Sequence, residues 1–169
     1  MIRIGLISDT HGYLDQAVFN HFENCDEIWH AGDFGDQDLA KRLSFDKLRM
    51  KKSLRGVFGN IDSADIRNEF PEQLVFICEQ VKVMMRHIGG YPPRYNPETK
   101  KELSLHRPQL FISGHSHILK VMYDEKIECL HINPGAAGKY GWHHTRTIIR
   151  FKIDGKQITD CEVIEMGTR

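Results

Sequence analysis

Five short fragments that carry histidines and carboxylates occur in one fixed order along the chain, and each follows an apolar run. They are Asp9-Thr10-His11, Gly32-Asp33, Gly59-Asn60, His87-Ile88-Gly89-Gly90 and Gly114-His115-Ser116-His117. Apolar runs of this length predict buried strands. Ligands of α/β sheets collect where strands end. The pattern therefore predicts an α/β fold that brings the five fragments together at one edge.

Seven side chains of these fragments are metal ligands by type: Asp9, His11, Asp33, Asn60, His87, His115 and His117. That number suits two divalent metal ions if one carboxylate bridges them. Asp9 and His11 lie two residues apart and can face the same side of an extended backbone. Each fragment alone is also a common turn sequence, so the prediction of a two-metal site depends on the ordered set.

Three other histidine positions leave alternatives open. His30, just before the Gly32-Asp33 fragment, is a candidate to assist catalysis or to be a hydrogen-bonded histidine at a strand end. His131 lies in a predicted strand and is expected to be structural. His143 and His144 either line the rim of the site or belong to an ordinary loop.

Length and charge narrow the classes of protein. The chain has 169 residues, 40% of them hydrophobic, which predicts a single domain over residues 1–169. Lys plus Arg equals Asp plus Glu at 23 each, so the formal net charge is zero. Nucleic acid and membrane partners are therefore not expected, since no global charge attracts them and no run approaches the roughly 18 apolar residues of a membrane span.

The cysteines and the first residues bear on location. The four cysteines are scattered and form no C-x-x-C pair, which argues against a thiolate zinc site. Residues 1–8 include Arg3 and run directly into the Asp9 fragment, without the apolar segment of a signal peptide. We therefore expect a cytoplasmic protein with free cysteines.

Hydrophobic periodicity predicts alternating strands and helices in the first half of the chain and mostly strands in the second half. In the first half, strands are expected at 2–7, 27–30 and 56–58, with helices at 14–24 and at 37–49 after Asp36 as N-cap. In the second half, a helix is expected at 97–106, and strands at 74–78, 81–87, 110–113, 119–123, 127–132, 147–153 and 157–164. Two packed sheets with helices outside accommodate both halves.

The motif order D-x-H, GD, GN, H and GHxH resembles that of the calcineurin-like metallophosphoesterase superfamily. The short spacing between His87 and His115, without an inserted cap, is similar to the small phosphodiesterase branch of that superfamily. The resemblance extends from residue 1 to about residue 140 and includes Asn133-Pro134-Gly135. It implies a four-layer α/β/β/α sandwich of two mixed β-sheets flanked by helices.

The resemblance also implies roles for the seven ligands. One metal would be held by Asp9, His11, Asp33 and His117, and the other by Asp33, Asn60, His87 and His115, with Asp33 bridging. Asn60 and His87 would also position the phosphate. The implied activity is that of a two-metal phosphoesterase, a phosphodiesterase rather than a monoesterase, in which a metal-bridging hydroxide attacks a small phosphate ester such as a nucleotide. Manganese is the expected metal, with iron, nickel or zinc as alternatives.

Two positions depart from the family pattern. Larger members have a histidine directly after the asparagine of the GN motif, where this chain has Ile61, followed by Asp62. Ala136 follows the Asn-Pro-Gly turn where serine is common. The alternative function is a catalytically silent scaffold of the same fold, as in the retromer subunit of this superfamily, although that subunit departs from the ligand set and this chain retains it. The oligomeric state does not follow from the sequence.

Overall fold

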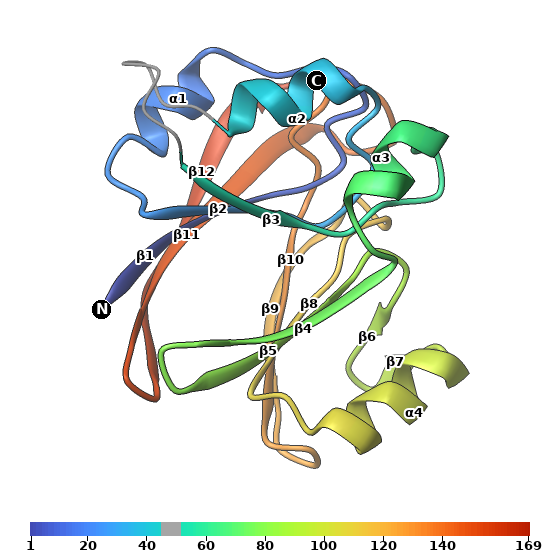
Figure 1. Ribbon diagram of the computed structural model, residues 1–169, viewed down its shortest axis with the longest axis vertical. Coiled ribbons are helices and arrows are strands. Elements are labelled where there is room, and N and C mark those ends of the chain that lie inside the picture. Colours follow the sequence, from blue (N-terminus) through green and yellow to red (C-terminus); the bar gives the residue numbers. More distant parts are fainter. Residues whose placement is uncertain (45–51) are drawn as a thin grey trace.

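Two five-stranded sheets pack against each other, and helices lie on their outer surfaces (Figure 1). The computed structural model describes residues 1–44 and 52–169. The first sheet has the strand order β12-β11-β1-β2-β3 and the second has the order β4-β5-β8-β10-β9. A separate pair, β6 and β7, completes the strands of the described part of the chain.

The first sheet combines the beginning and the end of the chain. Its strands are β1 (Ile2–Ile7), β2 (Glu27–His30), β3 (Ser53–Gly56), β11 (Thr145–Asp154) and β12 (Gln157–Thr168). The β1, β2 and β3 strands are parallel, whereas β11 is antiparallel to both β1 and β12. The carboxyl ends of the three parallel strands therefore meet at one edge of the sheet.

The second sheet comes from the middle of the chain and is also mixed. Its strands are β4 (Gln73–Cys78), β5 (Val81–Arg86), β8 (Leu110–Ile112), β9 (Leu119–Asp124) and β10 (Cys129–Pro134). The β5, β8 and β10 strands are parallel, and β4 and β9 pair antiparallel at the two edges. The short pair is β6 (Gly90–Tyr91) and β7 (Arg94–Tyr95).

The helices are α1 (Ala17–His21), α2 (Gln37–Leu43), α3 (Ala64–Glu69) and α4 (Pro97–His106). The α1 and α2 helices cover the outer face of the first sheet, and α4 lies outside the second sheet (Figure 1). This arrangement confirms the predicted four-layer sandwich. None of the helices in residues 1–44 and 52–169 is long and apolar enough to cross a membrane.

Three hydrophobic cores separate the four layers. The core between the sheets includes Trp29 and the inward residues Ile4 and Leu6 of β1. A second core joins the first sheet to α1 and α2, and a third joins the second sheet to α4. Gly5 faces the second core, where an added Cβ would lie only 2.7 Å from the Phe22 ring. Because the core between the sheets uses strands from both halves of the chain, we propose that residues 1–169 form one domain.

The predicted boundaries are wrong at two elements of the first half. The first helix is α1, shorter than the predicted 14–24, because the Asp15 carboxylate accepts a hydrogen bond from Ala17 N and forms a turn before it. The third strand is β3 rather than 56–58, because its register with β2 ends at Gly56 and Phe58 N instead donates to Pro71 O.

The strands β1 and β2 have the predicted bounds, and the remaining two elements of the first half are one confirmed helix and one unpredicted helix. Asp36 caps α2 as expected, with its carboxylate accepting from Leu39 N, although the predicted extension to residue 49 lies largely outside the described residues. The α3 helix has no counterpart in the prediction, because it has six residues and the Ser63 side chain makes no capping hydrogen bond.

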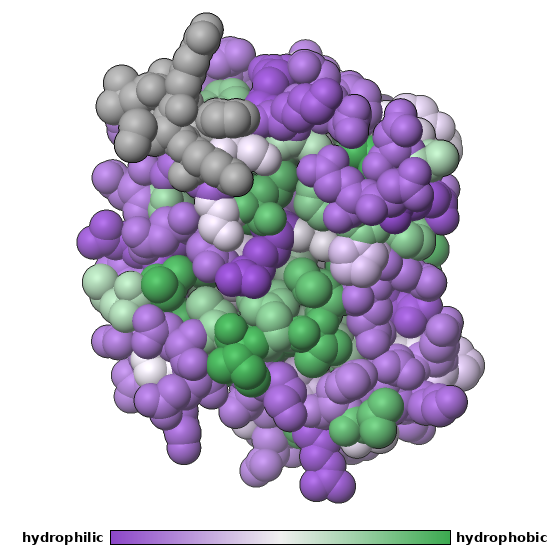
Figure 2. All heavy atoms as spheres, viewed as in Figure 1, coloured by the Kyte–Doolittle hydropathy of each residue, from purple (hydrophilic) through white to green (hydrophobic). Residues whose placement is uncertain are grey.

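Hydrophobic residues gather on the face drawn in Figure 2, over the edge strands β3 and β4. Leu54 of β3 and Phe76 of β4 are only partly buried there, although both pack against the cores. The Arg55 guanidinium lies 4.7 Å from the centre of the Phe76 ring. The Arg55 cation thus covers part of the hydrophobic surface over β3 and β4.

Candidate metal centre

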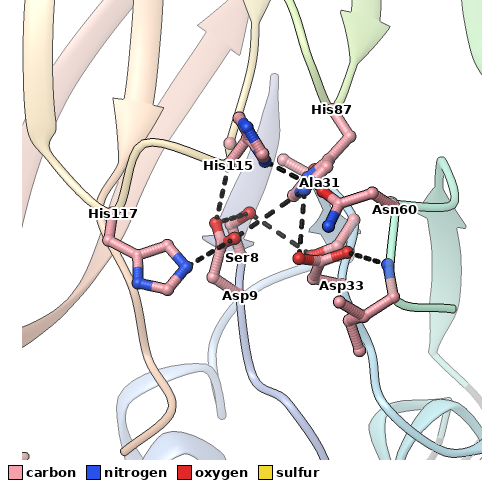
Figure 3. Close-up of polar contacts among 12 residues, drawn as sticks. Ser8, Asp9, Ala31, Asp33, Asn60, His87, His115 and His117 are labelled. Carbon is pink, nitrogen blue, oxygen red and sulfur yellow. Dashed lines mark hydrogen bonds and ion pairs between the residues drawn. The ribbon is translucent and has the colours of Figure 1, made fainter. Parts of the chain in front are cut away.

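The seven candidate ligands lie together at one edge of the sandwich, on loops that follow strands of both sheets. Asp9 and His11 follow β1, Asp33 follows β2, Asn60 follows β3, His87 follows β5, and His115 and His117 follow β8. The side chains that Figure 3 labels, which are all of them except His11, point toward a common centre. The sequence-based expectation that the five fragments converge therefore agrees with the geometry.

The first cluster contains Asp9, His11 and His117, whose ligand atoms all lie within 4.8 Å of one another. His117 Nε2 is 3.2 Å from Asp9 Oδ1 and 3.4 Å from His11 Nε2. The other carboxylate oxygen, Asp9 Oδ2, accepts hydrogen bonds from Ser8 Oγ at 2.6 Å and from His115 N at 3.1 Å. These bonds fix the buried carboxylate so that Oδ1 faces the two imidazoles.

The second cluster contains Asp33, His87 and His115, whose ligand atoms also lie within 4.8 Å of one another. His87 Nε2 is 3.3 Å from Asp33 Oδ2. His115 Nδ1 is 2.8 Å from Asn60 Oδ1, so the amide of Asn60 lies at the edge of this cluster. The donor set is two imidazoles, one carboxylate and one neutral amide oxygen.

Asp33 lies between the two clusters. Its Oδ2 atom is 3.3 Å from His87 Nε2 in the second cluster and 3.6 Å from His11 Nε2 in the first. Its Oδ1 atom accepts a hydrogen bond from Ile61 N at 3.1 Å. The Asp33 carboxylate therefore lies close to histidines of both clusters.

Two buried atoms at this centre have no hydrogen-bond partner, Asp9 Oδ1 and His87 Nε2. His87 Nδ1 lies 2.7 Å from Ala31 O, and a carbonyl oxygen only accepts, so Nδ1 carries the proton. In the neutral ring, the Nε2 lone pair then points at the Asp33 carboxylate, which is repulsive unless a cation lies between them. Buried polar atoms without partners cost about 1–3 kcal/mol each. The residues present therefore fit bound divalent cations.

The charges of the site shift the pKa values of its side chains. Burial lowers the pKa of His87, but interaction with the carboxylates, Asp33 first among them, raises it above its usual value. Burial raises the pKa of Asp33, but its contact with His87 lowers it overall. Burial lowers the pKa of both His11 and His115. Neutral imidazoles and ionised carboxylates are the forms that ligate metals.

Five of the seven candidates have left-handed backbone conformations: Asp9, His11, Asp33, His115 and His117, with φ values of 53°, 48°, 57°, 68° and 57°. Left-handed conformations are unfavourable for residues other than glycine, at about 1–3 kcal/mol each, and they concentrate at functional sites. The loops are therefore bent sharply where each ligand leaves its strand, and the bend turns the side chain toward the centre.

Asp62 ties together the loops that carry Asp33 and Asn60. Its buried carboxylate accepts hydrogen bonds from Gly35 N at 2.9 Å and from Gly59 N at 2.8 Å. Both oxygens are therefore used within the protein. Asp62 is thus not placed to take over from the histidine that larger family members have at position 61.

Asn133 fixes the loop that carries His115 and His117. Its side-chain amide donates to Gly114 O at 2.8 Å, and its oxygen accepts from Gly135 N at 3.0 Å. The Asn-Pro-Gly turn noted in the sequence therefore acts on the position of the histidine loop.

His30 is fully buried behind the site, stacked on the Phe34 ring at 3.6 Å between ring centres. Its Nδ1 accepts from Gly32 N at 3.1 Å, so the proton is on Nε2, which lies 2.9 Å from Thr10 Oγ1. Both ring nitrogens are therefore committed to the protein. This geometry gives no support to the catalytic alternative for His30 and agrees with the structural one.

Two cavities flank the clustered residues. One, of about 570 Å³, is lined by His115, His117, Tyr140, Trp142 and His143, among others. The other, of about 410 Å³, adjoins Asn60 and His87. Tyr140 and Trp142 were missed by the sequence reasoning, although two aromatic residues in the glycine-containing loop 138–144 were an available signal. His143 does line the rim, the first of its two predicted alternatives.

A family model described as the calcineurin-like phosphoesterase superfamily domain matches residues 2–156. The chain belongs to this superfamily. This chain is 29% identical over 170 residues to a probable metallophosphoesterase of Methanothermobacter thermautotrophicus. The matched residues cover 97% of this chain and 92% of the relative. The family expectation is therefore confirmed. By family, the chain is a metallophosphoesterase, and its structure contains two His/Asp clusters with the composition of metal sites.

Solved structures of the superfamily's fold also match. Wild-type Vps29 of Entamoeba histolytica complexed with Zn²⁺ has a TM-score of 0.76 at 16% identity, covering 97% of this chain and 99% of that one. A novel archaeal phosphodiesterase has a TM-score of 0.73 at 21% identity, covering 98% of this chain and all of that one, at 100%. At these identities the likenesses establish the fold alone.

Proposed function

We propose that this metallophosphoesterase is a phosphodiesterase that uses two divalent metal ions. The observation that carries the proposal is the pair of partnerless buried atoms, Asp9 Oδ1 and His87 Nε2, at a centre where the two clusters meet at Asp33. A cation bound at this centre would give both atoms a partner. The assignment of the ligands follows the family pattern and is supported by the two clusters.

In this assignment, Asp9, His11, Asp33 and His117 hold one ion, and Asp33, Asn60, His87 and His115 hold the other. Bound there, the ions would neutralise the nonbridging phosphate oxygens and lower the pKa of the attacking water. Manganese remains the expected metal, with iron, nickel and zinc as alternatives of similar ligand preference. The substrate would be a small phosphate ester, with a nucleotide ester as the leading candidate.

The chain's own residues would bind and orient the phosphate. His87 is held in one tautomer by Ala31 O, so its ring cannot rotate away from Asp33 without losing that bond. Asn60 brings a neutral oxygen to the rim beside His115 and adds no negative charge near a phosphate. Both residues would therefore position the substrate as well as ligate.

Neither Ile61, the position of the family's histidine, nor Asp62 nor His30 offers a proton to the leaving group. Ile61 is exposed at the rim and has no ionisable group. Asp62 and His30 are both committed to internal hydrogen bonds. We therefore propose that the enzyme acts on esters whose leaving oxygen departs readily, which favours aryl diesters and esters that expel a nucleotide phosphate over simple alkyl esters.

The leaving group gives a direct test. A general acid contributes about 10²–10⁴-fold, most of all for poor leaving groups. Across substituted phenyl phosphodiesters, kcat/KM should fall steeply as the leaving-group pKa rises, and Ile61→His should flatten the series. A flat series with the chemical step rate-limiting would show that another residue donates the proton.

Metal content tests the function itself. Purified protein reconstituted with Mn²⁺ should bind two ions per chain and hydrolyse diesters faster than the matching monoesters. Absence of bound metal and of turnover with either ester class would favour the scaffold alternative.

A further inference from the structure

An aromatic wall adjoins the first cluster. The loop 138–144, between β10 and β11, presents Tyr140 and Trp142, whose side chains are 70% and 94% exposed. Ile118, which follows the histidine loop, is also exposed and lines the same cavity. We call this surface the aromatic wall, after the rings of Tyr140 and Trp142, and include in it the aliphatic side chain of Ile118 beside them. Single exposed apolar residues are ordinary, but three around one cavity form a surface that a flat apolar ligand can cover.

The wall lies directly beside the candidate ligands. The Tyr140 ring is centred 5.0 Å from the His11 ring, and the His143 ring is 5.3 Å from the His117 ring. The shared cavity of about 570 Å³ is within the range of small-ligand sites. A ligand with its phosphate at the first cluster would therefore extend its next group along Tyr140 and Trp142.

The loop that carries the wall is held in place. His143 Nε2 lies 2.9 Å from Gly138 O, and Gly138 N donates to Asp9 O at 3.0 Å. Arg169 donates to Gly141 O. At Gly141, an added Cβ would fall 2.1 Å from His117 Nδ1, so only glycine permits this approach. The rings are thus presented on a fixed backbone, which reduces the entropy lost when a ligand stacks on them.

We propose that the aromatic wall binds the planar base of a nucleotide phosphodiester while the phosphate occupies the metal centre. Every base has a flat π face, and stacking on Trp or Tyr is favourable without a particular hydrogen-bond pattern. Arg169 lines the same cavity and adds a positive charge near the sugar-phosphate. The inference rests on the proposed function, since it takes the phosphate to lie at the two clusters.

Two substrates with one leaving group test the wall kinetically. Thymidine 5′-(p-nitrophenyl phosphate) and methyl p-nitrophenyl phosphate both expel p-nitrophenolate, but only the first carries a base. The protein should have the lower KM for the thymidine ester. Trp142→Ala should raise that KM roughly tenfold, the size of one stacking contact, with kcat unchanged. The KM for the methyl ester should not change.

Two variants serve as controls. Trp142→Phe keeps an aromatic face and should retain most of the preference for the thymidine ester. Tyr123→Ala removes an aromatic side chain of β9 that is 59% exposed and does not line the cavity, so neither KM should change. Equal KM values for the two esters in the unaltered protein, or an unchanged KM in Trp142→Ala, would overturn the inference.

Fluorescence separates the wall from the catalysis. The protein has two tryptophans, and Trp29 is fully buried, so a ligand at the wall should change the emission of Trp142 alone. Adenosine should quench the protein, ribose should not, and Trp142→Phe should abolish the response. Quenching without turnover of either ester would support the wall and contradict the proposed function. Turnover without quenching and without a preference for the base would support the proposed function and contradict binding at the wall.

Discussion

The polar groups beneath the candidate metal centre differ from those that face it. We call His30, Asp62 and Asn133 the floor, and every polar side-chain atom of these three has a hydrogen-bond partner within the protein. We call the six clustered residues the face: Asp9, His11, Asp33, His87, His115 and His117. Two buried atoms of the face have no partner.

The difference indicates that the floor contributes to stability, whereas the face is arranged for binding. The floor stabilises the fold and sets loop positions, because removing one of its bonds leaves a buried group unsatisfied. The face is unfavourable for stability by itself, since it gathers carboxylates, lone pairs and left-handed backbone in one place. Substitutions of the same chemical type should therefore have opposite consequences in the floor and the face.

The largest expected effect is on turnover in the face. Asp33→Asn replaces the charged carboxylate, whose Oδ2 lies near both clusters, with a neutral amide and should lower kcat on the order of a thousandfold, since metal assistance is worth several kcal/mol. Its metal-free stability should stay within about 1 kcal/mol of the parent. Asp65→Asn, on the exposed side of α3, is the matched control and should retain full activity. Substantial activity in Asp33→Asn with two bound ions would remove the bridging role.

Acid should act on interior histidines even when no metal is present. Burial lowers the pKa of His131 to about 4 from its usual 6.5, and it lowers the pKa of His30 in the same direction. The unfolded chain therefore binds more protons than the folded chain between these values, and stability falls as the pH drops from 6.5 toward 4. The His131 contribution amounts to about 3 kcal/mol once the pH is below its folded pKa.

Denaturant unfolding of chelator-treated protein at graded pH measures this loss. His131→Gln should make the pH dependence shallower, whereas His144→Gln, at an exposed position, should leave it unchanged. Identical slopes in all three proteins would mean that His131 is not held neutral by the fold.

In the floor, Asp62→Asn should destabilise the protein. One side-chain oxygen of the amide can still accept a backbone hydrogen bond, but the amide nitrogen would face the N–H of Gly35 or Gly59. The loss should be about 2 kcal/mol in the free energy of unfolding. Metal content, measured on the same preparation, should remain two ions per chain. If the variant were as stable as the parent, the hydrogen bonds of Asp62 would not stabilise the fold, and the role assigned to the floor would be wrong for this residue.

The smallest effect is expected at Asp9, where the substitution should stabilise the metal-free protein, whereas Asp62→Asn should destabilise it. In Asp9→Asn, the amide oxygen can accept from Ser8 and His115, and a new N–H faces His117 Nε2 at 3.2 Å, which can accept. The metal-free variant should therefore be more stable than the metal-free parent by about 1 kcal/mol.

Added metal should reverse that order. An ion at a hundredfold over its Kd stabilises the parent by about 2.7 kcal/mol, and the variant should gain much less. Thermal unfolding with and without Mn²⁺ measures both numbers. A metal-free variant that is less stable than the metal-free parent would contradict the distinction between floor and face.

The sequence predicted the layers and the face, because both follow from local rules. Alternation in β1 places Ile4 and Leu6 on one side, and ligands such as Asp9 and Asp33 directly follow apolar runs. The floor was not predictable in the same way. Asp62 accepts from Gly59 N in its own loop and from Gly35 N in a loop 27 residues away, and no side-chain spacing encodes the second bond. Backbone acceptors also decide the tautomer of His87.

The rim escaped prediction for a related reason. Trp142 lies near the metal centre only because the loop between β10 and β11 is held against β1, where Gly138 N donates to Asp9 O. The α3 helix was missed because six residues give too little periodicity for a pattern to emerge. Tertiary contacts place these elements, whereas strand ends place the ligands.

The bond from His115 N to Asp9 joins residues 106 positions apart and has a consequence for how the protein matures. Contacts between such distant segments require a large loop to close, and they favour slow, late assembly. A chain that is still being synthesised has the Asp9 and Asp33 loops long before the His115 loop exists. Under the proposed function, the site would therefore be complete only after the second sheet has docked, so metal binding would follow folding and stabilise only the completed fold.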